Sequence, residues 1–212
     1  MSVEQRWWPD QGSISILVHN YGGQRRNSGE YKENNETNLR LLSTFPCQLV
    51  FVQEHDSRLF QEDCSLFSMK GTGMENFHCA YGADKATGEA TGLACFGRAT
   101  SVASIQLLEQ DTVTVRKSQG GCLRKFETPI MAVKIHWVVH AVPLVVINVH
   151  FHHMAAKQQP GHKAAHLEIF EGISKMARDH GAHLLVGDFN QACPRMAAEL
   201  SKRRGWTVFA DC

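Results

Sequence analysis

The chain has 212 residues, of which 43% are hydrophobic and 20% are charged, as is ordinary for a globular protein. This length is enough for a single domain with a full core. The 22 basic and 21 acidic residues give a net charge of +1, so overall charge neither favours nor excludes a polyanionic partner. No run of 18 apolar residues is present, so the sequence predicts no membrane span.

Cysteine usage and the N-terminal segment bear on the cellular compartment. The seven cysteines are an odd number with no Cys-x-x-Cys pair, which disfavours a zinc ribbon or disulfide framework and favours a reducing compartment. Residues 1–11 are polar and lack the apolar run of a signal peptide. We therefore expect an intracellular protein with an N-terminal tail over 1–12 and one domain over 13–212. The sequence indicates no particular oligomeric state.

The first 53 residues predict a β-α-β arrangement. A short β-branched run, SISILVH at 13–19, predicts a strand, and residues 38–45 predict the end of a helix that Pro46 stops. The nearly continuous apolar run CQLVFVQ at 47–53 is typical of a strand that is buried on both faces.

The rest of the chain alternates between strand-rich and helical patterns. The middle predicts strands over 76–81, 91–96 and 101–108, then turns with at most a short hairpin over 109–127, where the sequence is polar. Antiparallel strands over 129–140 and 144–150 follow. The last third predicts a helix over 163–178, a strand over 183–186, a helix over 194–202 and a strand over 206–209. Together these elements indicate a layered α/β domain with antiparallel sheet content.

Polar side chains follow several of the predicted strands, at the point where each strand ends. They are Asn20, Glu54, His150, Asp188 and, two residues later, Asn190. Ligands commonly bind at such strand ends in layered α/β folds. A carboxylate directly after a buried strand is costly unless another group pairs with it. Glu54 and Asp188 are therefore candidates to share a hard cation such as Mg²⁺, which accepts one or two carboxylates.

Each of these residues also has a purely structural interpretation. Asn20 is a common turn residue, and Glu54 is suited to the positive end of a following helix. Asp188 and Asn190 suit an Asx-turn before the next helix. His150, His152 and His153 form a His-x-His-His run that would also suit a structural zinc site.

Five segments, taken in the order in which they occur along the chain, carry a family resemblance. They are ISILVHNYGG, LVFVQEHD, HCAYGADKATGEATGLACFGRA, PLVVINVHFHH and LLVGDFNQ, of which GDFN after a strand is the most specific. In this order the sequence resembles the endonuclease/exonuclease/phosphatase superfamily, which includes pancreatic-type deoxyribonuclease. The resemblance implies a four-layer α/β sandwich, with two mixed β-sheets face to face and helices outside. It also implies a Mg²⁺-dependent phosphoester hydrolase, with Mn²⁺ as a substitute, that acts on nucleic acid or another phosphoester.

The resemblance also implies a role for individual residues. Glu54 would be the principal metal ligand, with Asn20 beside it. His150 would contact the scissile phosphate, Asp188 would orient the attacking water, and Asn190 would hold the phosphate or fix that carboxylate. Two further residues would bind substrate: Arg98, where the family often has a basic residue, and His152, in the same cleft as His150.

The sequence departs from the family pattern at its C-terminal end. The family's final strand ends in Asp-His, and nothing follows Asp211-Cys212 here. We therefore expect a sandwich that lacks its last strands. Two alternatives to an active nuclease follow: a catalytically impaired phosphate-binding or interaction module, or a fragment of a larger mobile-element protein.

Overall fold

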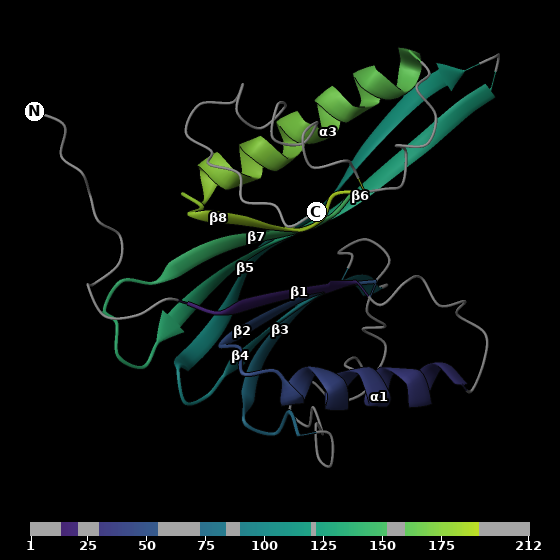
Figure 1. Ribbon diagram of the computed structural model, residues 1–212. Coiled ribbons are helices and arrows are strands. Elements are labelled where there is room, and N and C mark those ends of the chain that lie inside the picture. The colour runs from purple at the N-terminus through teal and green to yellow at the C-terminus, as the bar shows by residue number, and fades with distance from the viewer. Residues whose placement is uncertain are drawn as a thin grey trace, which may run out of the picture.

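The computed structural model describes residues 14–20, 30–54, 73–83, 90–119, 122–151 and 160–190, and these form four layers. Helix α1 (Glu30–Thr44) covers one sheet, helix α3 (Pro160–Asp179) covers a second sheet, and the two sheets face each other (Figure 1). The predicted α/β sandwich of two mixed sheets with helices outside is therefore confirmed. The described residues end at 190, so they do not test the helix predicted over 194–202 or the strand predicted over 206–209. They also do not test the prediction that the last strands of the sandwich are missing.

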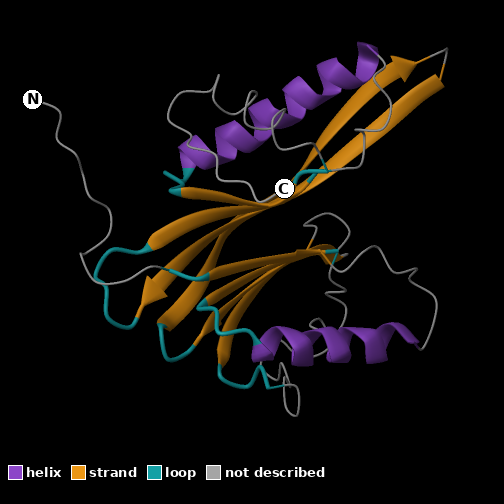
Figure 2. Ribbon diagram, viewed as in Figure 1, coloured by secondary structure: helices purple, strands orange, loops and turns teal. Residues whose placement is uncertain are grey.

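The first sheet has the strand order β1-β2-β4-β3 (Figure 2). Strands β1 and β2 are parallel, with Ile16 opposite Leu49, and the other pairs are antiparallel. The two parallel strands follow from the helix between them, because a crossover connection returns the chain in the same direction. The bounds of the strands are β1 (Ile16–Asn20), β2 (Leu49–Gln53), β3 (Phe77–Ala83) and β4 (Ala90–Arg98).

The second sheet has the strand order β5-β6-β7-β8. Strands β7 and β8, which α3 connects, are parallel, and His150 is opposite Asp188 at their last pair. Strands β5, β6 and β7 are antiparallel neighbours. Their bounds are β5 (Val102–Gln119), β6 (Cys122–Trp137), β7 (Leu144–His150) and β8 (Leu184–Asp188).

The prediction of turns over residues 109–127 is wrong for the part that forms strands. Strands β5 and β6 pair without a break from Leu107 opposite Val133, across one bulge, to Gln119 opposite Cys122. The physical reason is that Val113 and Val115 face α3 and join its core cluster. A Cβ placed on Gly172 of α3 would lie 2.6 Å from Val113 Cγ2, so helix and strand are in close contact there.

Three apolar layers hold the sandwich together. One cluster lies between α1 and the first sheet, another lies between the sheets, and the third lies between the second sheet and α3. Strand β6 shows the alternation that produces this arrangement: Ile130 and Ala132 belong to the α3 cluster, whereas Met131 and Val133 belong to the cluster between the sheets.

No helix in the described ranges is both long enough and apolar enough to cross a membrane.

Gly187, the residue before Asp188, stands where the backbone of β7 leaves no room for a side chain. Its φ is 141°, and a Cβ at this position would lie 1.9 Å from the carbonyl oxygen of Val149. We expect Gly187→Ala to lower the free energy of unfolding by at least ~3 kcal/mol, because backbone atoms cannot move aside as a side chain can. Urea denaturation followed by circular dichroism measures this.

Gly181→Ala is the matched control. Gly181 also has a positive φ, of 60°, but a Cβ there would meet nothing within 4 Å. Only the conformational cost of about 1–2 kcal/mol is therefore expected. Equal losses in the two variants would show that the contact with Val149 does not constrain the strands.

Candidate active site

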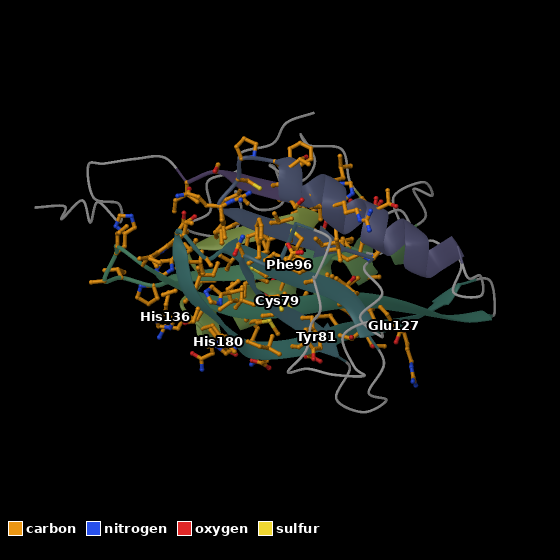
Figure 3. All side chains as sticks on the ribbon, turned by 90° about the horizontal axis from the view of Figure 1, so that it is seen from below. Cys79, Tyr81, Phe96, Glu127, His136 and His180 are labelled. Atoms are coloured by element: carbon orange, nitrogen blue, oxygen red, sulfur yellow. The ribbon has the colours of Figure 1, made fainter. Side chains whose placement is uncertain are left out.

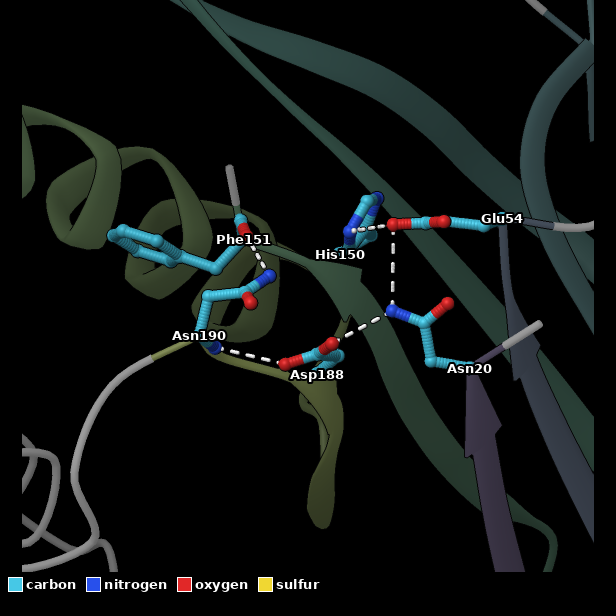
Figure 4. A network of polar contacts seen from close by, with 6 residues as sticks. All are labelled: Asn20, Glu54, His150, Phe151, Asp188 and Asn190. Carbon is cyan, nitrogen blue, oxygen red and sulfur yellow. Dashed lines mark hydrogen bonds and ion pairs between the residues drawn. The ribbon is translucent and has the colours of Figure 1, made fainter. Parts of the chain in front are cut away.

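Polar side chains from the ends of β1, β2, β7 and β8 meet at one edge of the sandwich (Figure 4). The Asn20 side-chain amide nitrogen Nδ2 donates hydrogen bonds to Asp188 Oδ2 at 2.6 Å and to Glu54 Oε1 at 3.4 Å. The same Glu54 oxygen lies 3.0 Å from Nε2 of His150. The structure thus brings together four residues that are 168 positions apart at the extremes of the sequence.

Asp188 and Asn190 form a compact turn at the end of β8. The Asn190 backbone N–H donates to Asp188 Oδ1 at 2.8 Å, as in an Asx-turn. The Asn190 side-chain nitrogen donates to the carbonyl oxygen of Phe151 at 2.7 Å, and the Phe151 N–H donates to the carbonyl oxygen of Asp188 at 2.7 Å. The turn interpretation is therefore compatible with a site at Asp188, because the turn uses one carboxylate oxygen and Asn20 uses the other.

A pair of buried amides, Gln53 and Asn148, lies beneath this cluster. Both side chains are 0% exposed, and Gln53 Nε2 donates to Asn148 Oδ1 at 2.7 Å. Asn148 Nδ2 in turn lies 3.2 Å from the carbonyl oxygens of Val52 and Ala94. These bonds join β7 of the second sheet to β2 and β4 of the first. Sequence reasoning gave these two residues no role, although polar residues inside otherwise apolar strands were the available signal.

Two residues of the cluster have left-handed backbone conformations. The φ of Glu54 is 57° and that of Asn190 is 47°. Asn tolerates this region, whereas Glu adopts it at a cost of about 1–2 kcal/mol. Strain of this kind persists where the surrounding structure imposes it, commonly at functional sites. The conformation turns the Glu54 side chain toward Asn20 and His150.

The acidic part of the cluster has the donor atoms that a hard cation requires. Glu54 Oε1 and Asp188 Oδ2 both lie within 3.4 Å of the Asn20 side-chain nitrogen, so the two carboxylates are close to each other. Within the described part of the chain, the second Glu54 oxygen, Oε2, is buried and has no hydrogen-bond partner. Leaving a carboxylate oxygen buried and unpaired is costly, and a bound cation would relieve that cost. The residues therefore fit Mg²⁺, although no group of three or more His, Cys, Asp or Glu among the described residues surrounds one metal position.

Burial shifts the titration of three groups near these strands. It lowers the pKa of His19, which precedes Asn20 on β1, and so favours the neutral imidazole. It raises the pKa of the Cys47 and Cys95 thiols, which are buried. Neither thiol is thus suited to act as a thiolate nucleophile.

The structure does not bring Arg98 to the cluster, so we withdraw it as a substrate-binding residue of this site. Its backbone N–H pairs with the carbonyl of Gln48, at the start of β2, whereas Glu54 follows the end of that strand, roughly 20 Å away. Its guanidinium donates to the Cys47 and Phe45 carbonyls and lies 4.6 Å from the centroid of the Phe77 ring. Arg98 thus caps the chain after α1. His152 lies outside the described residues.

Comparison with solved structures identifies the fold. A conserved protein of unknown function from Enterococcus faecalis matches with a TM-score of 0.56 and 19% identity, over 90% of this chain and 72% of its own. An endonuclease/exonuclease/phosphatase family protein from Bacteroides thetaiotaomicron matches with a TM-score of 0.52 and 14% identity, over 84% and 63%. The chain has the endonuclease/exonuclease/phosphatase fold.

A further structure with this fold is ANGEL2, described as a 2′,3′-cyclic phosphatase in complex with adenosine-2′,3′-vanadate. It matches with a TM-score of 0.50 and 16% identity, over 84% of this chain and 53% of its own. The chain thus spans less than two thirds of the length of two of these three structures. No protein-family model and no curated protein sequence matches the chain.

A double-mutant cycle tests whether the buried amides act as one unit. We expect Gln53→Leu and Asn148→Leu each to lower the free energy of unfolding by roughly 2–4 kcal/mol, because each leaves a buried amide unpaired. The double variant should lose less than the sum, with a coupling of roughly 1–3 kcal/mol. Asn38→Leu, at a partly exposed position of α1, is the control and should change stability little. Additive losses from the two single variants would contradict a direct link between the sheets.

Proposed function

We propose that the chain is a metal-dependent phosphoester hydrolase, most specifically a nuclease that cleaves phosphodiester bonds by in-line attack of water. The observation that carries this proposal is the convergence of Glu54 and Asp188 on Asn20, with the second oxygen of Glu54 buried and unpaired. The fold supports it, because a protein with the same fold, ANGEL2, is described as a phosphatase bound to a vanadate ester of adenosine.

Glu54 and Asp188 would hold Mg²⁺, with Asn20 between them. When bound, the cation would neutralise the two carboxylates and polarise a phosphoryl oxygen. Mn²⁺ would substitute for it, because both ions prefer oxygen ligands.

The remaining residues of the cluster supply the acid–base and positioning chemistry. Asp188 accepts hydrogen bonds from Asn20 and from the Asn190 backbone, and a carboxylate has about four acceptor sites, so capacity remains to accept a proton from an attacking water. His150, held against Glu54, would donate to a phosphate oxygen as negative charge develops on it. Asn190, whose side chain is tied to Phe151, would keep the Asp188 carboxylate oriented.

Hydrolysis assays with isosteric variants test the two carboxylates. Bis(p-nitrophenyl) phosphate, supercoiled DNA and single-stranded RNA serve as substrates, with Mg²⁺, Mn²⁺ or EDTA. We expect metal-dependent hydrolysis that falls at least ~100-fold in Glu54→Gln and in Asp188→Asn, because each amide removes charge without removing volume.

Matched controls come from carboxylates elsewhere on the chain. Glu109→Gln breaks a contact with His180, and Asp179→Asn breaks a surface pair with Lys175, so both should hydrolyse like the wild type. A folded wild type that hydrolyses none of the substrates in any metal would refute the enzyme proposal and leave a phosphate-binding module. Activity that survives in EDTA would refute the role of the metal.

A further inference from the structure

Gln53 uses one end of its side-chain amide to link the two sheets and leaves the other end without a partner. Its Nε2 donates to Asn148 Oδ1 at 2.7 Å, and the side chain is 0% exposed. Among the described residues, none donates a hydrogen bond to the buried Oε1. Burying an acceptor without a donor is costly, so this oxygen requires a donor that the link between the sheets does not provide.

The hydrogen bonds around Asn148 fix which atom of the Gln53 amide is the oxygen. Asn148 Nδ2 lies 3.2 Å from the carbonyl oxygens of Val52 and Ala94, and carbonyl oxygens only accept. The Oδ1 of Asn148 is therefore the acceptor that faces Gln53, and Gln53 must present its nitrogen there. A rotated Gln53 amide would place two oxygens against each other, so the atom without a partner is the oxygen.

The neighbouring side-chain amides have no hydrogen left to donate to this oxygen. Asn20 is the register partner of Gln53 on β1. The two N–H groups of its side chain donate to Glu54 and Asp188. Both N–H groups of the Asn148 side chain are also used, by the two backbone carbonyls.

Two further donors of the first sheet lie on its far face. Gln53 points toward the second sheet, because it bonds to Asn148 of β7. Cys79, Tyr81 and Phe96, which are labelled in Figure 3, belong instead to the cluster between α1 and the first sheet. The sheet itself therefore separates the Cys79 thiol and the Tyr81 hydroxyl from Gln53. A donor for Gln53 Oε1 would then come from outside these side chains, and water is the smallest such donor.

The next residue carries a second buried oxygen in the same situation. Glu54 Oε2 is buried and, like Gln53 Oε1, lacks a partner within the described ranges. Both residues stand at the end of β2, where the proposed cation would bind. Mg²⁺ keeps several of its water molecules when one or two carboxylates bind it, and each water has two hydrogens to donate. A water molecule in the shell of a cation at Glu54 is thus a suitable donor for Gln53.

We propose that Gln53 is a positioning residue of the cation site, and that its Oε1 accepts a hydrogen bond from a water molecule in the shell of the Mg²⁺ held by Glu54 and Asp188. This inference rests on the proposed metal-dependent function and adds a residue to its site. Gln53 touches neither the cation nor the substrate. It fixes the orientation of one coordinated water, as neighbours of metal ligands commonly do.

Metal affinity separates this role from the link between the sheets. Gln53→Leu removes both the link and the acceptor oxygen, whereas Asn148→Leu removes the link and leaves Gln53 Oε1 in place. Binding of Mn²⁺ is measured from the free-ion signal in electron paramagnetic resonance, at a temperature at which circular dichroism shows each variant to be folded. We expect Gln53→Leu to bind Mn²⁺ about tenfold more weakly than Asn148→Leu, although the two variants lose similar stability.

Gln110→Leu controls for the loss of a buried glutamine as such. The Oε1 of Gln110 also has no partner within the residues that the structure describes, but Gln110 lies on β5, two strands from Asn148. This variant should bind Mn²⁺ like the wild type. Gln53→Met, which keeps the length of the side chain and lacks the oxygen, takes the place of Gln53→Leu if the leucine variant does not fold.

The outcomes distinguish the inference from the function on which it rests. Equal affinities of Gln53→Leu and Asn148→Leu, or an equal loss in Gln110→Leu, would overturn the inference and leave the proposed function standing. A wild type that binds neither Mn²⁺ nor Mg²⁺ would refute the metal site and the inference with it. A wild type that binds metal but hydrolyses no substrate would refute only the hydrolase function, and the measured affinities would still decide the role of Gln53.

Discussion

The hydrogen bond between the buried side chains of Gln53 and Asn148 is the constraint on which the site depends. Apolar faces alone hold two sheets together without fixing how far one slides over the other. A buried amide pair adds direction, because a shift of even an ångström leaves donors and acceptors unpaired in a dry interior. Gln53 directly precedes Glu54, and Asn148 lies two residues before His150, so this bond joins the two strands whose ends carry the 3.0 Å contact between Glu54 and His150.

The backbone conformations of Gly187 and Glu54 also position the site residues. The close approach of Gly187 to Val149 allows β8 to pair with β7 up to His150 and Asp188, and so brings their side chains to the same edge. The left-handed conformation of Glu54 then turns the chain sharply after β2. The strain at Glu54 is small beside the packing of the four-layer sandwich, in which Val52 and Phe51 are 0% exposed.

Strands and site residues could be predicted from the sequence where the local pattern of apolar residues matches their burial in the folded protein. Short apolar runs followed by Asn20, Glu54 and Asp188 predicted the strands and a shared site at their ends. Parallel pairing brings Asn20 to Glu54 in one sheet and His150 to Asp188 in the other, and the packing of the two sheets brings the pairs together. The start of β5 and the end of β6 were predicted as strands, but their continuous pairing through the polar residues 109–127 was not, because it depends on the contact of Val113 with α3. Arg98 was misplaced for a related reason: β4 is antiparallel to β2, so its last residue lies at the start of β2.

The charge of the site itself limits what it can bind. Among the six residues of the network in Figure 4, only His150 can carry a positive charge, whereas Glu54 and Asp188 are acidic. Such a site repels an anionic substrate unless a cation offsets its charge. The cation proposed for Glu54 and Asp188 would therefore serve twice: it would satisfy the buried second oxygen of Glu54, and it would remove the repulsion that a phosphoester meets at the two carboxylates.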